Sequence, residues 1–156
     1  MSELQTGTYE PEFRNVDIQT EILRDLNSEF KLAAQAKGLD FKLFIEANDS
    51  IIFADQYSVT QILANLLGNA IKYTSKGFVS LKVYRNNDNR ICIDIEDTGI
   101  GISEEFKEHL FEPFRQEEQG YTRKHEGNGL GLALVKEYCR INECEISVNS
   151  KKGFGT

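Results

Sequence analysis

The sequence predicts an α+β fold, a two-layer sandwich of a mixed, mostly antiparallel sheet covered on one face by about three helices. Alternating apolar residues, typical of half-buried strands, occupy residues 41–54 and 79–95. Apolar residues at helical spacing occupy residues 18–34, 59–71 and 129–141. The strands are expected as hairpins without regular strand–helix–strand alternation, and no phosphate loop follows the first strand. A Rossmann or P-loop fold is therefore disfavoured.

The chain length of 156 residues suits one domain with one hydrophobic core. A net charge of -7 argues against nonspecific binding to nucleic acid, so no nucleic-acid partner is expected. The three cysteines lack C-x-x-C spacing, which favours reduced thiols in a cytoplasmic protein over a zinc site or disulfides. The sequence contains neither an apolar run of about 18 residues nor an N-terminal signal peptide.

The N-terminal half is expected to hold two helices and two strands. Residues 1–16 are polar and aperiodic and are interpreted as a linker, so the domain itself is placed at residues 17–156. Asp17 is the predicted N-cap of a helix that ends near Lys37. Residues 41–45 and 50–54 are expected to pair with each other as strands. Asp55 is the predicted cap of a second helix that ends at Lys76 and Gly77.

The C-terminal half begins with a predicted hairpin, whose strands at 79–83 and 91–95 are joined by residues 86–89. A short helix is expected from Ser103, a mobile lid at 115–128 and a third helix at 129–141. Residues 145–149 are expected to form a strand before a turn at 153–156. We interpret that strand as the first arm of a hairpin whose second arm is missing, which would expose a sheet edge.

The polar face of the second helix is the first functional signal. Asn65, Asn69, Lys72, Tyr73 and Lys76 share it, opposite the apolar stripe. The simplest alternative is a solvated polar face. However, asparagine is a poor helix former, and two of them lie one turn apart. An amide oxygen suits a hard cation and a lysine suits phosphate, which together fit Mg²⁺ bound with nucleotide phosphates.

The second signal is Asp97-Thr98-Gly99-Ile100-Gly101, directly after a predicted strand. An ordinary turn at the end of a strand would have the same composition. A functional aspartate there would accept a hydrogen bond from an exocyclic amine such as adenine N6. The two glycines would let the backbone approach a flat ring.

The third signal is Gly127-Asn128-Gly129-Leu130-Gly131-Leu132, which opens the third helix. Unpaired amides at a helix N-terminus bind anions, although such a glycine pattern alone is weak evidence. Between the second and third signals lies Phe111-Glu112-Pro113-Phe114. That segment is compatible with a core plug under a loop, with a hinge for the lid, or with both.

Together, in this order and spacing, the signals resemble the GHKL ATPase superfamily of histidine kinases, gyrase, Hsp90 and MutL. Residues 65–73 match its N box, 97–101 the G1 box, 111–114 the F box, 127–131 the G2 box and 153–156 the G3 turn. The F box and the phrase Asn-Ala-Ile-Lys-Tyr-Thr resemble the catalytic and ATP-binding domain of sensor histidine kinases, which has a Bergerat-type fold. The resemblance spans about residues 16–156, and residues 1–16 resemble the segment leaving the dimerisation hairpin.

The resemblance implies roles for individual residues. Asn69 would bind Mg²⁺, and the proposed catalytic set is Asn65, Asn69 and Lys72. Tyr73 would pack near the nucleoside and Asp97 would read adenine, with Thr156 beside it. Further implied nucleotide contacts are Gly99, Ile100, Gly101, Phe114, Arg115, Gly127, Asn128, Gly129, Leu130, Gly131 and Leu132. Arg115, Arg123 and Lys124 are candidate lid cations. Asn128 departs from the family pattern, which usually has threonine there.

The implied activity is transfer of the γ-phosphate of ATP to a histidine on a separate dimerisation helix of a two-component sensor kinase, upstream of a response regulator. ATP-hydrolysing members have a glutamate where this chain has Asn65, and an amide cannot act as general base. An anti-sigma-type serine kinase and a nucleotide-binding pseudokinase remain alternatives. Neither His109 nor His125 lies on a long helix, so neither is expected to accept phosphate. The chain is expected to be monomeric and its parent kinase homodimeric.

Overall fold

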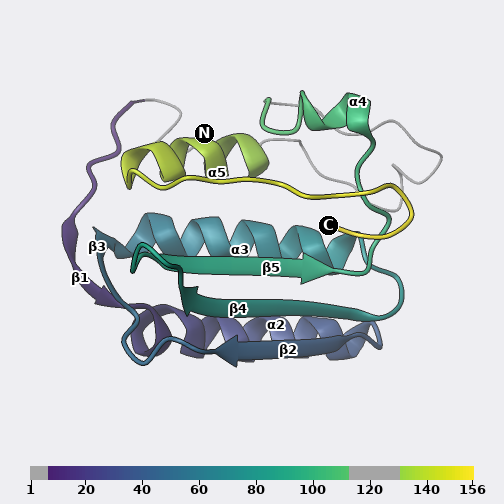
Figure 1. The fold of residues 1–156 in the computed structure, drawn as a ribbon, viewed down its shortest axis with the longest axis horizontal. Coiled ribbons are helices and arrows are strands. Elements are labelled where there is room, and N and C mark those ends of the chain that lie inside the picture. Colours follow the sequence, from purple (N-terminus) through teal and green to yellow (C-terminus); the bar gives the residue numbers. More distant parts are fainter. Residues whose placement is uncertain (1–6, 113–130) are drawn as a thin grey trace.

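The computed structural model describes residues 7–112 and 131–156, and its main sheet is mixed (Figure 1). Strand β2 (Asp40–Ile45) pairs in parallel with β4 (Phe78–Arg85), which pairs antiparallel with β5 (Ile91–Asp97). The β4–β5 connection through residues 86–90 is the predicted hairpin. The expected α+β class with a mixed sheet is therefore confirmed.

A second, two-stranded sheet contains β1 (Phe13–Asp17) and β3 (Ile51–Asp55), which run antiparallel. The predicted pairing of residues 41–45 with 50–54 is wrong, because β1 takes the edge of β3 while β2 pairs with β4. The linker prediction also differs from the structure at its end, since residues 13–16 lie in β1. Alternation identified β2 and β3 as strands, but it carries no information about which strand is the partner.

The helices begin largely where their capping residues predict. A π-helical turn η1 (Gln19–Leu23) leads into α2 (Arg24–Ala36), and α3 (Gln56–Lys72) follows β3. Asp55 accepts a hydrogen bond from the amide of Ser58 (3.2 Å), as expected of an N-cap. Ser103 caps α4 (Glu104–Lys107) in the same way, and α5 spans Gly131–Ile141. Helix α3 ends at Lys72, before the predicted Lys76, and the chain turns at Gly77, where φ is +106°, to enter β4.

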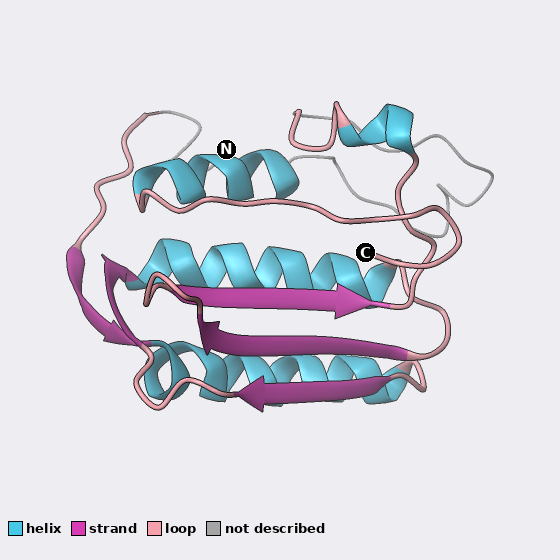
Figure 2. Ribbon diagram, in the orientation of Figure 1, coloured by secondary structure: helices cyan, strands magenta, loops and turns pink. Residues whose placement is uncertain are grey.

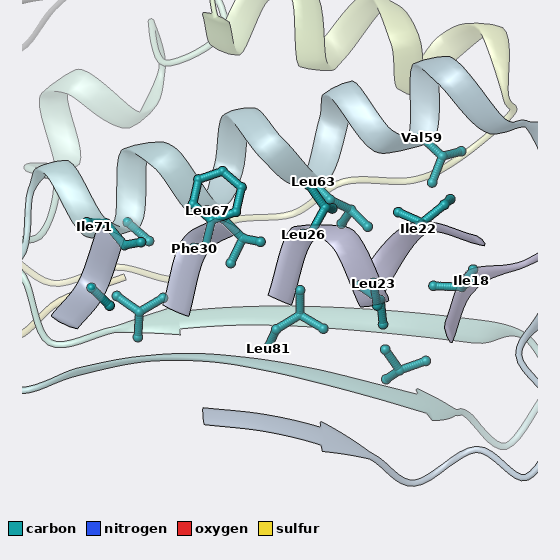
Figure 3. Packing of buried hydrophobic residues seen from close by; sticks show 14 of the residues in the cluster. Ile18, Ile22, Leu23, Leu26, Phe30, Val59, Leu63, Leu67, Ile71 and Leu81 are labelled. Carbon is teal, nitrogen blue, oxygen red and sulfur yellow. The ribbon is translucent and has the colours of Figure 1, made fainter. Parts of the chain in front are cut away.

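The core lies between the sheet and helices α2 and α3, which pack on the same face of it (Figure 3). Leu26 and Phe30 of α2 meet Leu63 and Leu67 of α3 above Leu81 of β4. Burying each such side chain contributes about 1.5–3 kcal/mol. A smaller cluster of Ile62, Val135, Tyr138 and Cys139 attaches α5 to the other side of α3. This packing fixes the rotation of α3, so its polar face points away from the core.

The predicted strand at residues 145–149 is wrong, because the segment runs as a loop after α5 (Figure 2). Ile146 and Val148 are half-buried while Glu145, Ser147 and Asn149 are exposed, so the alternation is real. Alternation decides which side chains face inward, but it does not supply a hydrogen-bonded neighbour for the backbone. The turn predicted next is present, closed by a bridge between Lys151 and Gly155. None of the helices in the described part of the chain combines the length and apolarity that crossing a membrane requires.

Candidate functional site

An open groove lies between α3, the end of β5, the start of α5 and the C-terminal segment 145–156. Most of the described site residues predicted from the sequence line this groove. They are Asn65, Asn69, Lys72, Tyr73, Asp97, Ile100, Gly101, Gly131, Leu132 and Thr156. The structure therefore brings together residues from four segments that are up to 91 positions apart, counted from Asn65 to Thr156.

The α3 side of the groove presents amide and ammonium groups. Asn65 donates from Nδ2 to the carbonyl oxygen of Gln61 (2.9 Å), which fixes its side chain along the helix. Its Oδ1 faces the start of α5, because a Cβ placed on Gly131 would lie 3.2 Å from that oxygen. Lys72 places Nζ 5.4 Å from the centre of the Tyr73 ring. One face of α3 thus offers neutral oxygens and a positive charge to the same space.

Asp97 also lines the groove, as the last residue of β5. Its Oδ1 accepts hydrogen bonds from the amides of Gly99 (2.9 Å) and Thr156 (3.2 Å). The backbone amide of Asp97 donates to the carbonyl oxygen of Thr156 (2.8 Å). Burial raises the pKa of Asp97 above its ordinary value, although the two amide donors oppose that shift. Among the described residues, backbone donors thus orient the carboxylate through Oδ1 alone.

Glycines are required where the turn after β5 meets the C-terminal turn. Gly101 has φ of +72°, and a Cβ there would overlap the carbonyl oxygen of Lys151. Gly155 has φ of +110°, and a Cβ there would overlap the carbonyl oxygen of Asp97. Both positions combine a left-handed backbone with close contact, so any side chain would separate the two turns. Gly99 does not line the groove, but it lies directly behind Asp97.

Ser150 holds the two turns together, and sequence reasoning missed it. Its hydroxyl accepts from the amide of Ile102 (2.8 Å) and donates to the carbonyl oxygen of Gly155 (2.9 Å). It also lies 2.8 Å from the hydroxyl of Thr156. A serine in a polar stretch gives no signal in the sequence, because only the fold brings these partners to it.

Lys37 was interpreted only as the end of a helix, yet its side chain reaches the end of α3. Nζ donates to the carbonyl oxygens of Ile71 (2.7 Å) and Lys72 (3.2 Å). Both carbonyls lie at a helix C-terminus, where a cation is favoured by the helix dipole. Burial lowers the pKa of Lys37. This contact anchors the part of α3 that carries Lys72 and Tyr73.

Several predicted site residues lie outside the described part of the chain. These are Phe114, Arg115, Gly127, Asn128, Gly129 and Leu130, together with the predicted lid at 115–128 and its Arg123, Lys124 and His125. His109 is described and sits in the turn after α4. Its Nδ1 lies 3.1 Å from Glu112, and its side chain is 39% exposed. The structure thus pairs His109 with a carboxylate in a turn, and not on a long helix.

The side chains along the groove offer amide oxygens. Within the described residues, no group of three or more histidine, cysteine, aspartate or glutamate side chains could hold a metal ion. Asn69 nevertheless lines the groove, and its side-chain amide carries an oxygen of the kind that binds Mg²⁺. Mg²⁺ is commonly bound through few protein oxygens plus waters and nucleotide phosphates. The residues present therefore fit a metal that arrives with a nucleotide.

Comparison with known proteins shows the family to which this fold and groove belong. The profile of the histidine kinase-, DNA gyrase B-, and HSP90-like ATPase family matches residues 54–156. The chain belongs to this family, and its resemblance to the catalytic ATP-binding domain of histidine kinases is confirmed.

Two relatives are similar over most of this chain. Hybrid signal transduction histidine kinase B of Dictyostelium discoideum is 36% identical over 143 residues, which is 86% of this chain and 7% of that protein. The autoinducer 2 sensor kinase/phosphatase LuxQ of Vibrio parahaemolyticus is 36% identical over 140 residues, which is 86% of this chain and 16% of that protein. The chain thus spans a small part of each relative.

Solved structures show the same architecture. The crystal structure of full-length ShkA in complex with AMPPNP is 29% identical, with a TM-score of 0.82 over 97% of this chain and 31% of that one. The catalytic domain of histidine kinase ThkA, in a nucleotide-free form, is 25% identical, with a TM-score of 0.70 over 83% of this chain and 80% of that one.

Proposed function

We propose that this chain binds Mg-ATP in the groove and transfers the γ-phosphate to a histidine on a separate dimerisation helix of a longer sensor kinase. The observation that carries the proposal is the convergence of the α3 polar face, Asp97 and the first residues of α5 on one groove. The names of the relatives and the AMPPNP complex of ShkA support it.

The geometry suggests how the groove would hold the nucleotide. The second oxygen of Asp97 makes no hydrogen bond within the described residues, so it is available to the N6 amine of adenine. Tyr73 and Ile100 line the wall between Asp97 and α3, where the nucleoside would lie. Lys72 and the N-terminal end of α5 would then face the phosphates, since a cation and free helix amides both attract anions. Gly101 would keep the backbone close to the base, and Gly99 would orient Asp97 through its amide.

Asn69 is the residue we assign to Mg²⁺, through its side-chain oxygen and together with phosphate oxygens. The ion would neutralise phosphate charge during transfer. Asn65 is assigned a supporting role, because its amide already donates to Gln61 and its oxygen faces Gly131. The proposed contacts of Phe114, Arg115 and residues 127–130 rest on the sequence resemblance alone.

Transfer to an external histidine is favoured over hydrolysis for a chemical reason. A water nucleophile needs a general base near the metal, and the amide of Asn65 cannot accept a proton near neutral pH. His109 makes a poor acceptor, since it lies in the turn after the four-residue helix α4 and not on a long helix. We therefore propose that the acceptor histidine lies on a dimerisation hairpin that leads into residues 1–12. The kinase module would be cytoplasmic, and its phosphate would pass to a response regulator.

Phosphotransfer in trans tests this proposal. The chain is incubated with Mg²⁺ and γ-labelled ATP, alone and with a purified helical hairpin that carries the acceptor histidine of a sensor kinase. We expect no label on the chain and slow, acid-labile label on the hairpin, first order in hairpin because no tether raises its effective concentration. Rapid ATP turnover without hairpin would indicate a hydrolase, and ATP binding without transfer to any hairpin would indicate a pseudokinase.

A further inference from the structure

Thr74 follows the C-cap of α3 and is fully buried, with 0% of its surface exposed. Within the described residues, its Oγ1 is the one buried side-chain nitrogen or oxygen atom that has no hydrogen-bond partner. Leaving such a group unpaired costs roughly 1–3 kcal/mol. Valine has nearly the same shape and would avoid that cost, so the hydroxyl requires an explanation other than packing in this state.

The surroundings of the hydroxyl point to the wall that holds Asp97. A Cβ built on Gly99 would lie 2.8 Å from Thr74 Oγ1, 3.0 Å from Asp97 Oδ1 and 2.5 Å from the carbonyl oxygen of Tyr73. The hydroxyl and the carboxylate therefore flank the same side of the Gly99 backbone. The amide of Ile100 donates to the carbonyl oxygen of Tyr73 (3.2 Å), which joins the two turns at this point.

Thr74 does not line the groove, whereas Asp97 does. Any effect of the hydroxyl on a ligand must therefore pass through Asp97 and the turn that carries it. Once a bound base covers the carboxylate, Asp97 loses solvent, and its negative charge needs further donors. Within the described residues the Thr74 hydroxyl has no hydrogen bond to break, and it flanks the side of Gly99 that Asp97 Oδ1 also flanks.

We propose that Thr74 is a positioning residue for nucleobase recognition, whose hydroxyl donates to the Asp97 carboxylate, directly or through one enclosed water, when the base is bound. This inference rests on the proposed nucleotide function of the groove. It assigns a task to a residue that contacts no ligand, and it explains why a costly hydroxyl occupies a fully buried position.

The proposal predicts opposite effects on stability and on binding. Thr74→Val should leave the midpoint of thermal unfolding of the nucleotide-free chain unchanged or raised, because it removes an unpaired buried hydroxyl. The same variant should weaken ATP binding by roughly three- to tenfold, the fold-change of one net hydrogen bond of about 0.5–1.5 kcal/mol. Thr74→Ser keeps the hydroxyl and should retain most of the ATP affinity while losing some stability with the methyl group.

A base analogue separates positioning from structural damage. Purine riboside triphosphate lacks the 6-amino group, so it gains less from a well-oriented Asp97. Thr74→Val should therefore lower its affinity less than it lowers the affinity for ATP, whereas a general distortion of the groove would lower both equally.

Calorimetric titrations of the wild type and both variants with each triphosphate, together with thermal unfolding without nucleotide, decide the matter. Equal ATP affinity in wild type and Thr74→Val would overturn the inference while leaving the proposed function intact. A lower unfolding midpoint for Thr74→Val than for Thr74→Ser would also overturn it, because the hydroxyl would then already have a structural role. Absence of ATP binding by the wild type would remove the proposed function and this inference with it.

Discussion

Replacing Asp97 with asparagine should make the nucleotide-free protein no less stable while weakening ATP binding. The substitution keeps an oxygen that can accept from Gly99 and Thr156, so the turn retains its hydrogen bonds. It removes a carboxylate whose pKa is raised by burial. A raised folded-state pKa means that the stability this group contributes is present at low pH and is lost as pH rises through that pKa. At neutral pH the buried charge is therefore a cost that asparagine relieves.

The loss in binding follows from the second carboxylate oxygen. It would accept a hydrogen bond from the adenine amine, and in asparagine an NH₂ group can occupy that position and face the amine instead. A hydrogen bond to a charged group contributes about 1.5–3 kcal/mol, so ATP affinity should fall roughly 10- to 150-fold. GTP presents a carbonyl there, and its weak binding to the wild type should fall less.

Calorimetry with ATP and GTP measures the affinities, and urea unfolding across pH measures the stability. Asp40→Asn is the matched control, since Asp40 is exposed on β2 and does not line the groove. Equal binding of ATP and GTP by the wild type, or an unchanged ATP affinity in Asp97→Asn, would refute the reasoning.

Three other substitutions test the supports of the site. Asp55→Ala removes the α3 cap and the acceptor for Tyr9 and the Glu12 amide, so urea unfolding should show about 1–3 kcal/mol lost. In the wild type, hydrogen bonds outweigh burial and lower the Asp55 pKa. The stability that Asp55 contributes should therefore be lost only as pH falls below 3.8, the ordinary pKa of an aspartate. Lys37→Met should lower the affinity for ATP severalfold by loosening the end of α3, with exposed Lys31→Met as its control. Gly101→Ala should destabilise the chain and weaken ATP binding, whereas Gly68→Ala, whose Cβ would meet only Phe30 at 3.9 Å, should raise stability by about 0.5–1 kcal/mol. An unchanged unfolding curve for Gly101→Ala would contradict the close contact with Lys151.

The sequence predicted the helices and the hairpin well because their signals are local. Asp55 and Ser103 lie at caps, and helical spacing places the polar face of α3 without reference to any other segment. Strand partners were less predictable, since pairing depends on distant segments. β1 escaped detection because its residues are mostly polar, and only Val16 in it is fully buried.

The candidate site divides in the same way. Asn69 and Asp97 could be predicted because their residue types stand out at particular places on a helix and after a strand. Ser150, Lys37 and Thr74 could not be predicted. Ser150 bonds to Ile102 and Lys37 bonds to Ile71, and both partners are 34 or more positions away in the chain. Thr74 matters because its hydroxyl has no partner within the described residues. These residues act through tertiary contacts, which a pattern along the chain does not encode.

Calorimetric titration of the folded wild-type chain with ATP, in Mg²⁺ and again in excess chelator, tests the central claim most directly. The account predicts saturable binding of one ATP per chain that is tighter in Mg²⁺, with the Mg²⁺ enhancement lost in Asn69→Ala. A folded protein that gives no heat of binding with ATP in either condition would contradict the assignment of this groove as a nucleotide site.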